Sequence, residues 1–113
     1  MNDWNAEEGT IEFWVRKDKL QWNDGSIHVL LNLTKKDASG SIFMIKDKDN
    51  KLKFFHVILG KGRTDVETNV SELSSDKDHY VAVIWSVKTK QIRLFIDGEV
   101  VAESTIKYDS REL

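Results

Sequence analysis

The chain has 113 residues, with 17 Lys and Arg against 19 Asp and Glu, so its formal net charge is −2. This length suits one domain, because domains average about 100–200 residues. Nucleic-acid-binding proteins carry a basic excess or stripe that this charge balance lacks, so nucleic acid is not an expected partner. The absence of Cys excludes disulfides, thiolate metal sites and cysteine nucleophiles.

Neither the start of the chain nor its hydropathy indicates a membrane segment. The first ten residues, MNDWNAEEGT, are acidic and polar, whereas a signal peptide begins basic and continues apolar. The longest apolar run, Tyr80–Trp85, is far shorter than the roughly 18 residues of a membrane span. We therefore expect no membrane insertion, and we predict a single domain over residues 1–113.

In chain order, apolar side chains recur with a period of two residues, not 3.6. Val, Ile and aromatic residues dominate these segments, as is typical of half-buried strands. The pattern predicts strands at Thr10–Lys17, Ser26–Thr34, Ser41–Asp47, Lys51–Leu59, His79–Val87 and Gln91–Asp97. In the first two strands the alternation assigns to the core Ile11, Phe13, Val15, Ile27, Val29, Leu31 and Leu33.

Turn residues separate these segments and predict how the strands connect. Asp97-Gly98 tolerates the positive φ angles of a two-residue hairpin, which pairs its preceding strand with Val100–Ile106. Asp49-Asn50 predicts a second hairpin, and Thr64–Val70 is more polar, as expected of an edge strand. Ser71–Asp78 is expected to carry a short helical turn. About eight strands at this spacing predict an antiparallel sandwich or barrel.

Two segments resemble a known family. GTIEFWVRK at 9–17 resembles an early strand of the laminin-G-like, concanavalin A-type lectin and glucanase sandwiches, and HYVAVIWSVKTKQIRLFIDGEVVAE at 79–103 resembles a later signature. The resemblance implies an all-β jelly roll of two antiparallel sheets. Members of the family bind glycans or proteins, often with calcium, and some cleave β-glucans. The resemblance also implies an extracellular or cell-surface location, whereas the acidic, polar start with its initiating Met fits an intracellular or a trimmed chain, so both locations stay open.

Compared with that family, this chain predicts a shortened sandwich. Complete members are longer, with a strand before the GTIEFWV segment and another after the last hairpin. The chain is therefore a minimal version of the fold, an excised piece, or a sandwich whose missing edge a partner supplies. An unpaired sheet edge invites pairing with another chain. We therefore expect self-association through a sheet edge or an apolar outer face, giving a homo-oligomer.

The acidic residues and histidines do not favour an enzyme or a metalloprotein. Glycan hydrolysis needs two carboxylates about 5 Å apart, and no acidic pair alternates within an apolar strand; Glu99 and Glu103 are four residues apart. Calcium needs six to eight oxygen ligands. The Asp47–Asn50 stretch is interleaved with lysines, Asn23-Asp24 is a second loop candidate, and the turn explains Asp97. Calcium is thus not favoured, no cofactor is expected, and the three histidines lack the spacing of zinc ligands.

The alternate face of the strands carries the candidate ligand-binding residues. Aromatic rings among Arg, His and Asn suit a sugar platform, and they equally suit a protein interface. A competing interpretation is that Trp14 and Trp85 complete the core. Trp4 and Trp22 lie beside turn residues and are expected to be partly exposed. The candidates are Trp14, Arg16, Trp22, His28, Asn32, Arg93 and Phe95.

The sequence therefore predicts a non-catalytic, lectin-like recognition module that binds carbohydrate or protein. The alternative is a self-assembling structural module completed by oligomerisation. A degenerate or partial glycan hydrolase is the third and least favoured hypothesis.

Overall fold

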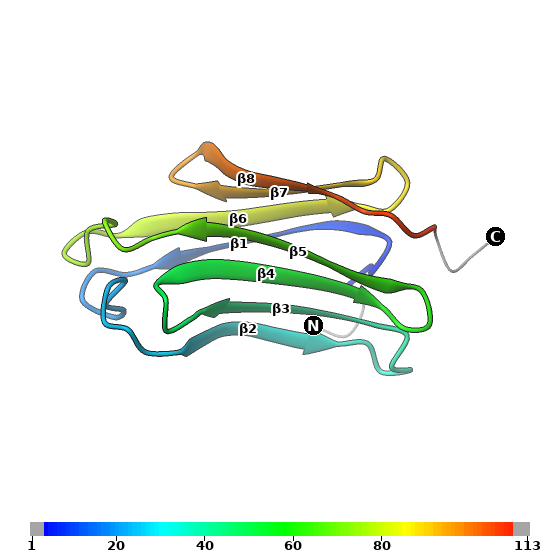
Figure 1. The fold of residues 1–113 in the computed structure, drawn as a ribbon, viewed down its shortest axis with the longest axis horizontal. Helices are drawn as coiled ribbons and strands as arrows, with labels where there is room; N and C mark the ends of the chain where they lie inside the picture. Colours follow the sequence, from blue (N-terminus) through cyan, green and yellow to red (C-terminus); the bar gives the residue numbers. More distant parts are fainter. Residues whose placement is uncertain (1–3, 110–113) are drawn as a thin grey trace.

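The computed structural model describes residues 4–109 as two four-stranded sheets packed face to face (Figure 1). Sheet A has the strand order β1-β6-β7-β8 and sheet B the order β2-β3-β4-β5, with antiparallel pairing throughout. The strands are β1 (Glu8–Val15), β2 (His28–Thr34), β3 (Gly40–Lys46), β4 (Lys51–Ile58), β5 (Gly62–Asn69), β6 (His79–Ser86), β7 (Gln91–Ile96) and β8 (Glu99–Thr105). The predicted all-β sandwich is confirmed.

The turns behave as their residues predict, except in one segment. Asp97-Gly98 joins β7 to β8 with φ angles of 53° and 86°, and Asp49-Asn50 lies in the turn between β3 and β4. The helical turn predicted at Ser71–Asp78 is wrong, because this segment forms only turns and bends. Its carbonyls serve tertiary contacts instead, since Ser74 O accepts a hydrogen bond from His79 and Ser75 O accepts one from Asp18 N.

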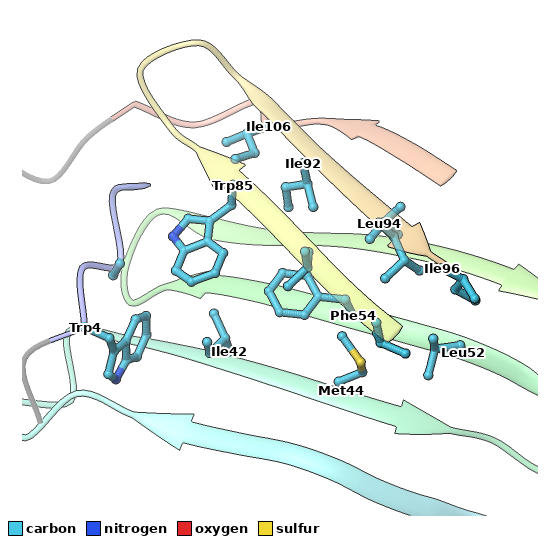
Figure 2. Packing of buried hydrophobic residues seen from close by; sticks show 14 of the residues in the cluster. Trp4, Ile42, Met44, Leu52, Phe54, Trp85, Ile92, Leu94, Ile96 and Ile106 are labelled. Carbon is cyan, nitrogen blue, oxygen red and sulfur yellow. The ribbon is translucent and has the colours of Figure 1, made fainter. Parts of the chain in front are cut away.

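The core lies between the sheets and is centred on Trp85 of β6 (Figure 2). Its ring stacks on Phe54 of β4 at a centroid distance of 6.0 Å, so the two sheets meet through aromatic surface. Trp4 contacts the same indole edge-on at 6.2 Å, and Trp85 Nε1 donates a hydrogen bond to the Asn5 carbonyl. Core side chains that surround this cluster include Ile42, Met44, Leu52, Ile92, Leu94, Ile96 and Ile106.

One side of the sandwich is closed. There the edge strands β5 and β8 contact each other, and Ser104 Oγ donates to the Asp65 carbonyl at 2.6 Å. Tyr108 follows β8 and places its hydroxyl 2.7 Å from His56 Nδ1, while His56 Nε2 donates to the Ala6 carbonyl. Burial lowers the pKa of His56, so the imidazole is neutral in this network.

The opposite side, between β1 and β2, is open. In the part of the chain that the structure describes, neither strand has a neighbour on its outer edge. The side chains that point from these strands toward the core are only partly buried, whereas the core positions of the central strands are fully covered. These partly buried residues are Ile11, Phe13 and Val15 of β1 and Leu30, Leu31 and Leu33 of β2.

A β-bulge changes which face of β2 looks inward. The register between β2 and β3 shifts between Val29 and Leu31, so the alternation predicted for this strand breaks at Leu30. Leu31 and Leu33 face the core as predicted, but the core positions predicted for Ile27 and Val29 are wrong, since these side chains are 61% and 60% exposed. A shift of one residue moves a side chain to the other face of a sheet.

Among residues 4–109, no helix is long or apolar enough to cross a membrane.

A substitution at Gly9 tests the packing around the Trp85 indole. A Cβ atom at Gly9 lies 2.7 Å from Cζ2 of the Trp85 indole, which is buried and has no room to retreat. We expect Gly9→Ala to lower the free energy of unfolding by about 1–3 kcal/mol, the usual cost of overpacking a core. Urea unfolding measures this change, with Thr10→Ala as the matched neighbour whose side chain is exposed. Equal stability of the two variants contradicts the expectation.

Candidate functional site

Apolar side chains from all four strands lie on the outer face of sheet A, called here the aromatic face. Cross-strand pairing places Trp14 opposite Tyr80. One row along, Ala82 lies opposite Phe95, and Phe95 lies opposite Val100. Exposed contiguous apolar patches on soluble proteins mark binding surfaces. The face consists of Trp14, Tyr80, Ala82, Ile84, Phe95 and Val100.

Trp14 is the most exposed aromatic ring of this face. Its side chain is 53% exposed although it lies within a regular strand. The Tyr80 ring lies 5.2 Å away at a tilt of 52°, and the Arg16 guanidinium lies 5.6 Å from the indole centroid. Glu12 accepts a hydrogen bond from the Tyr80 hydroxyl, which raises the pKa of Tyr80. These neighbours hold the indole in place while leaving it accessible.

A groove runs beside Trp14 where β1 ends and β2 begins, in the open side of the sandwich. Its volume is about 380 Å³. Apolar side chains from both strands form part of its lining, and three basic side chains contribute to the rest: Arg16, Lys19 and His28. Two of these bases have acidic partners, because Arg16 pairs with Asp78 at 3.2 Å and His28 pairs with Asp24 at 2.7 Å.

The seven predicted site residues are divided among four places. Trp14, Arg93 and Phe95 lie together on the outer face of sheet A. Arg16 and His28 line the groove. The remaining two, Asn32 and Trp22, are elsewhere.

Asn32 lies on the outer face of sheet B, opposite Phe43. Trp22 is 1% exposed and its ring packs against His79, so it is not available to stack on a ligand. Trp4, at 7%, is also buried, and the partial exposure predicted for both residues is wrong. Although both residues lie in loops, these loops fold back over the ends of the core, which alternation along strands does not reveal.

Sequence reasoning missed the aromatic residues of the second outer face. Phe43 and Phe55 pair across β3 and β4 on the outside of sheet B, with ring centroids 5.7 Å apart. The Arg63 guanidinium lies 5.0 Å from the Phe55 ring. Tyr80 on sheet A was missed as well. The alternation within each strand does place these side chains on outer faces, and applying it to every strand would have found them.

The side-chain oxygens that the sequence analysis considered as calcium ligands contact nitrogen donors. Lys46 is fully buried, and its ammonium donates to Asp24 Oδ1 at 2.5 Å and to Asn50 Oδ1 at 3.0 Å. Asp47 accepts hydrogen bonds from two backbone amides and pairs with Lys53 at 3.0 Å. Two lysines thus supply the positive charge, so these oxygens do not fit a calcium site.

Asp97, the other acidic loop residue, accepts a hydrogen bond from Tyr80 N and pairs with His79 at 2.7 Å. Its carboxylate anchors the hairpin to β6. Across residues 4–109, no cluster of three or more His, Asp or Glu side chains is placed to hold a metal ion.

The contact between Lys46 and Asp24 leads to a prediction about how folding stability changes at low pH. The Lys46 ammonium, with His28 and Ser26 N, holds the pKa of Asp24 well below its usual range. A lowered pKa in the folded state contributes stability above the unfolded pKa of about 4, and this contribution is lost as the pH falls through the folded pKa. We expect Asp24→Asn to lower the urea midpoint at pH 7, and the difference from wild type to narrow toward pH 2.

Asp49→Asn, an exposed position in the same region, is the matched control and is expected to leave the midpoint nearly unchanged. A difference for Asp24→Asn that stays constant from pH 7 to pH 2 contradicts the electrostatic origin.

Comparison with known proteins agrees with this fold. The family model of the concanavalin A-like lectin/glucanases superfamily matches residues 2–112. Domains LG4-5 of the mouse laminin alpha1 chain have a TM-score of 0.65 and 19% identity, over 87% of this chain and 23% of that one. The CBM40 of a Ruminococcus gnavus IT-sialidase, bound to alpha2,6 sialyllactose, has a TM-score of 0.58 and 18% identity. This match covers 94% of the present chain and 56% of the CBM40 chain.

The chain thus spans about a quarter and about half of the lengths of these two solved chains. A search of curated proteins gives no match. The laminin likeness establishes a jelly-roll architecture, in agreement with the two antiparallel sheets described above. With a family model that covers nearly all of its residues, this protein belongs to the concanavalin A-like lectin/glucanases superfamily.

Proposed function

We propose that this protein is a non-catalytic carbohydrate-binding module and that its ligand lies on the aromatic face of sheet A. The main support for this proposal is the exposed Trp14 indole, 53% accessible and braced by Tyr80 and Arg16. Regular packing buries an indole, because it is the largest apolar side chain. An accessible ring in a well-paired strand therefore supports a binding role for this face.

The neighbours of Trp14 suit a sugar better than a purely apolar ligand. The C–H face of a pyranose ring packs on an indole, while its hydroxyl groups need polar partners at the rim of the contact. Glu12 and Arg16 stand beside Trp14, and Arg93 lies on the same face, where it pairs with Glu103 at 3.3 Å. Apolar rings with charged side chains at their margin are the composition that this mode of binding requires.

The structural neighbours support the same class of function. One of them is a carbohydrate-binding module bound to sialyllactose, and the other is a laminin module. Both resemble this chain in fold at less than 20% identity, so the residues that would bind a sugar here are argued from the aromatic face alone. A protein ligand on this face is the alternative.

We propose no catalytic role for the acidic residues of this face. Glu103 is engaged by Arg93, and Glu12 by the Tyr80 hydroxyl. A retaining glycosidase needs one carboxylate as nucleophile and a second, with a raised pKa, as acid. Turnover of a β-glucan by the purified protein would contradict this part of the proposal.

The fluorescence of Trp14 can report whether a ligand covers the aromatic face. The other three tryptophans are buried, so a ligand that covers the aromatic face changes mainly the fluorescence of Trp14. We expect a glycan array, followed by titration of its hits with sialyllactose and lactose as reference sugars, to give a saturable fluorescence change. Trp14→Ala, measured by isothermal titration calorimetry because the substitution removes the fluorescent reporter, is expected to weaken binding at least tenfold, about 1.4 kcal/mol, since the stacking surface is lost.

Phe55→Ala is the matched control, since it removes an aromatic ring from the outer face of sheet B. It is expected to leave the affinity unchanged. Loss of binding in Phe55→Ala but not in Trp14→Ala would place the site on the other sheet. A blank array under all conditions, with binding to a protein ligand abolished by Trp14→Ala, would favour the protein-binding alternative.

We also propose that ligand binding needs no calcium, because Lys46 and Lys53 supply the positive charge beside the candidate oxygens. Titrations in EDTA and in millimolar calcium are expected to give the same Kd. A change of tenfold or more on adding EDTA contradicts this expectation.

A further inference from the structure

The free edge of β1 differs from the other three sheet edges. β5 and β8 contact each other on the closed side of the sandwich. β2 is interrupted by its bulge, which disturbs a ladder of hydrogen bonds. β1 pairs with β6 in unbroken register over all eight residues, so it is straight enough to accept another strand along its outer edge.

The apolar side chains along this edge are incompletely covered. Ile11, Phe13 and Val15 face the core but remain partly exposed. The groove of about 380 Å³ continues this opening to the end of β1. A strand added to β1 would cover these side chains and bond the backbone groups of the edge, the two effects that favour addition of a strand to a sheet.

The charges along β1 indicate which strand fits. The start of β1 is acidic, with Glu7 and Glu8, while Arg16, Lys17 and Lys19 follow its end. Two copies of such a strand, paired antiparallel around a two-fold axis, bring each acidic start beside the basic end of the other. The two ends of the strand are therefore complementary in charge.

We propose that β1 pairs antiparallel with β1 of a second copy, with the two-fold axis at Glu12, and joins the two A sheets into one eight-stranded sheet. Opposed residues in an antiparallel pair lie on the same face. This register keeps the core-facing residues together and places Glu8 opposite Arg16 of the second copy. Ile11 lies opposite Phe13 on the inner face, and Thr10 lies opposite Trp14 on the outer face.

Two features of the free chain are compatible with this contact. Arg16 meets Asp78 through one guanidinium nitrogen, so further donors remain for a second carboxylate. On the axis the two Glu12 carboxylates oppose each other, which is unfavourable, but each accepts a hydrogen bond from Tyr80 of its own sheet and the two Glu8–Arg16 pairs are attractive. Edge pairing leaves the outer face of sheet A uncovered, so the dimer carries two aromatic faces side by side.

Charge reversal tests the proposed register. Light scattering behind size exclusion, at about 100 µM protein, is expected to give the mass of a dimer for wild type. Arg16→Glu sets two carboxylates against each other at both ends of the pair, and we expect at least a tenfold rise in the dissociation constant. Glu8→Lys combined with Arg16→Glu restores opposite charges and is expected to restore the dimer. The double variant also retains any local effect of the Arg16→Glu substitution on Asp78, so it separates folding from pairing.

Disulfide trapping locates the axis, and the chain has no Cys of its own to interfere. Opposed residues in an antiparallel pair have Cα atoms about 4.5–5.5 Å apart, within the range that a disulfide spans. Glu12→Cys is therefore expected to give a covalent dimer on mild oxidation. Glu67→Cys, on the outer face of sheet B, is the matched control and is expected to stay monomeric on denaturing gels.

A wild-type monomer at this concentration overturns the proposal. A dimer that persists in Arg16→Glu and gives no cross-link through Glu12→Cys also overturns it, because another surface then joins the copies. A cross-link in both cysteine variants indicates random collision and counts against the register. Each result is independent of glycan binding, since the masses are measured without any sugar.

Discussion

The structure depends on the packing of Trp85. Its indole lies where the N-terminal segment, β1 and both sheets meet: Phe54 covers one face, Trp4 meets it edge-on, and Gly9 leaves the space it occupies. Its Nε1 donates to the Asn5 carbonyl, so the polar atom is satisfied inside the core. One residue thus joins chain segments 80 positions apart.

This core is closed unevenly, and the asymmetry determines which apolar side chains stay partly exposed. On the β5/β8 side, Tyr108 and His56 bring the segment after β8 onto sheet B through partly buried hydrogen bonds. On the β1/β2 side, apolar residues reach the edge and remain partly exposed. Accessible apolar surface therefore lies around β1: the aromatic face on the outside of its sheet, and the edge and groove beside it.

Electrostatic pairing inside the loops engages the acidic side chains that lie there. Lys46 is buried among the oxygens of Asp24 and Asn50, and Lys53 pairs with Asp47. These contacts stabilise the turns with ammonium groups in place of a metal. The charges of these loops thus stabilise the fold, while the Trp14 ring and the Arg93 guanidinium lie exposed on the outer face of sheet A.

The strands, their hairpins and the class of fold could be predicted from the residues alone, because alternation of period two and the Asp97-Gly98 turn are local signals. The same alternation placed Trp14, Arg93 and Phe95 on an outer face. Tertiary contacts were needed to establish that Trp22 is buried, that Val29 points outward at a bulge, and that Asn32 lies on the other sheet from Trp14. Alternation assigns a side chain to one of two faces of its own strand. Which sheet that strand joins, and which loops fold over its ends, depends on contacts between residues far apart in the chain.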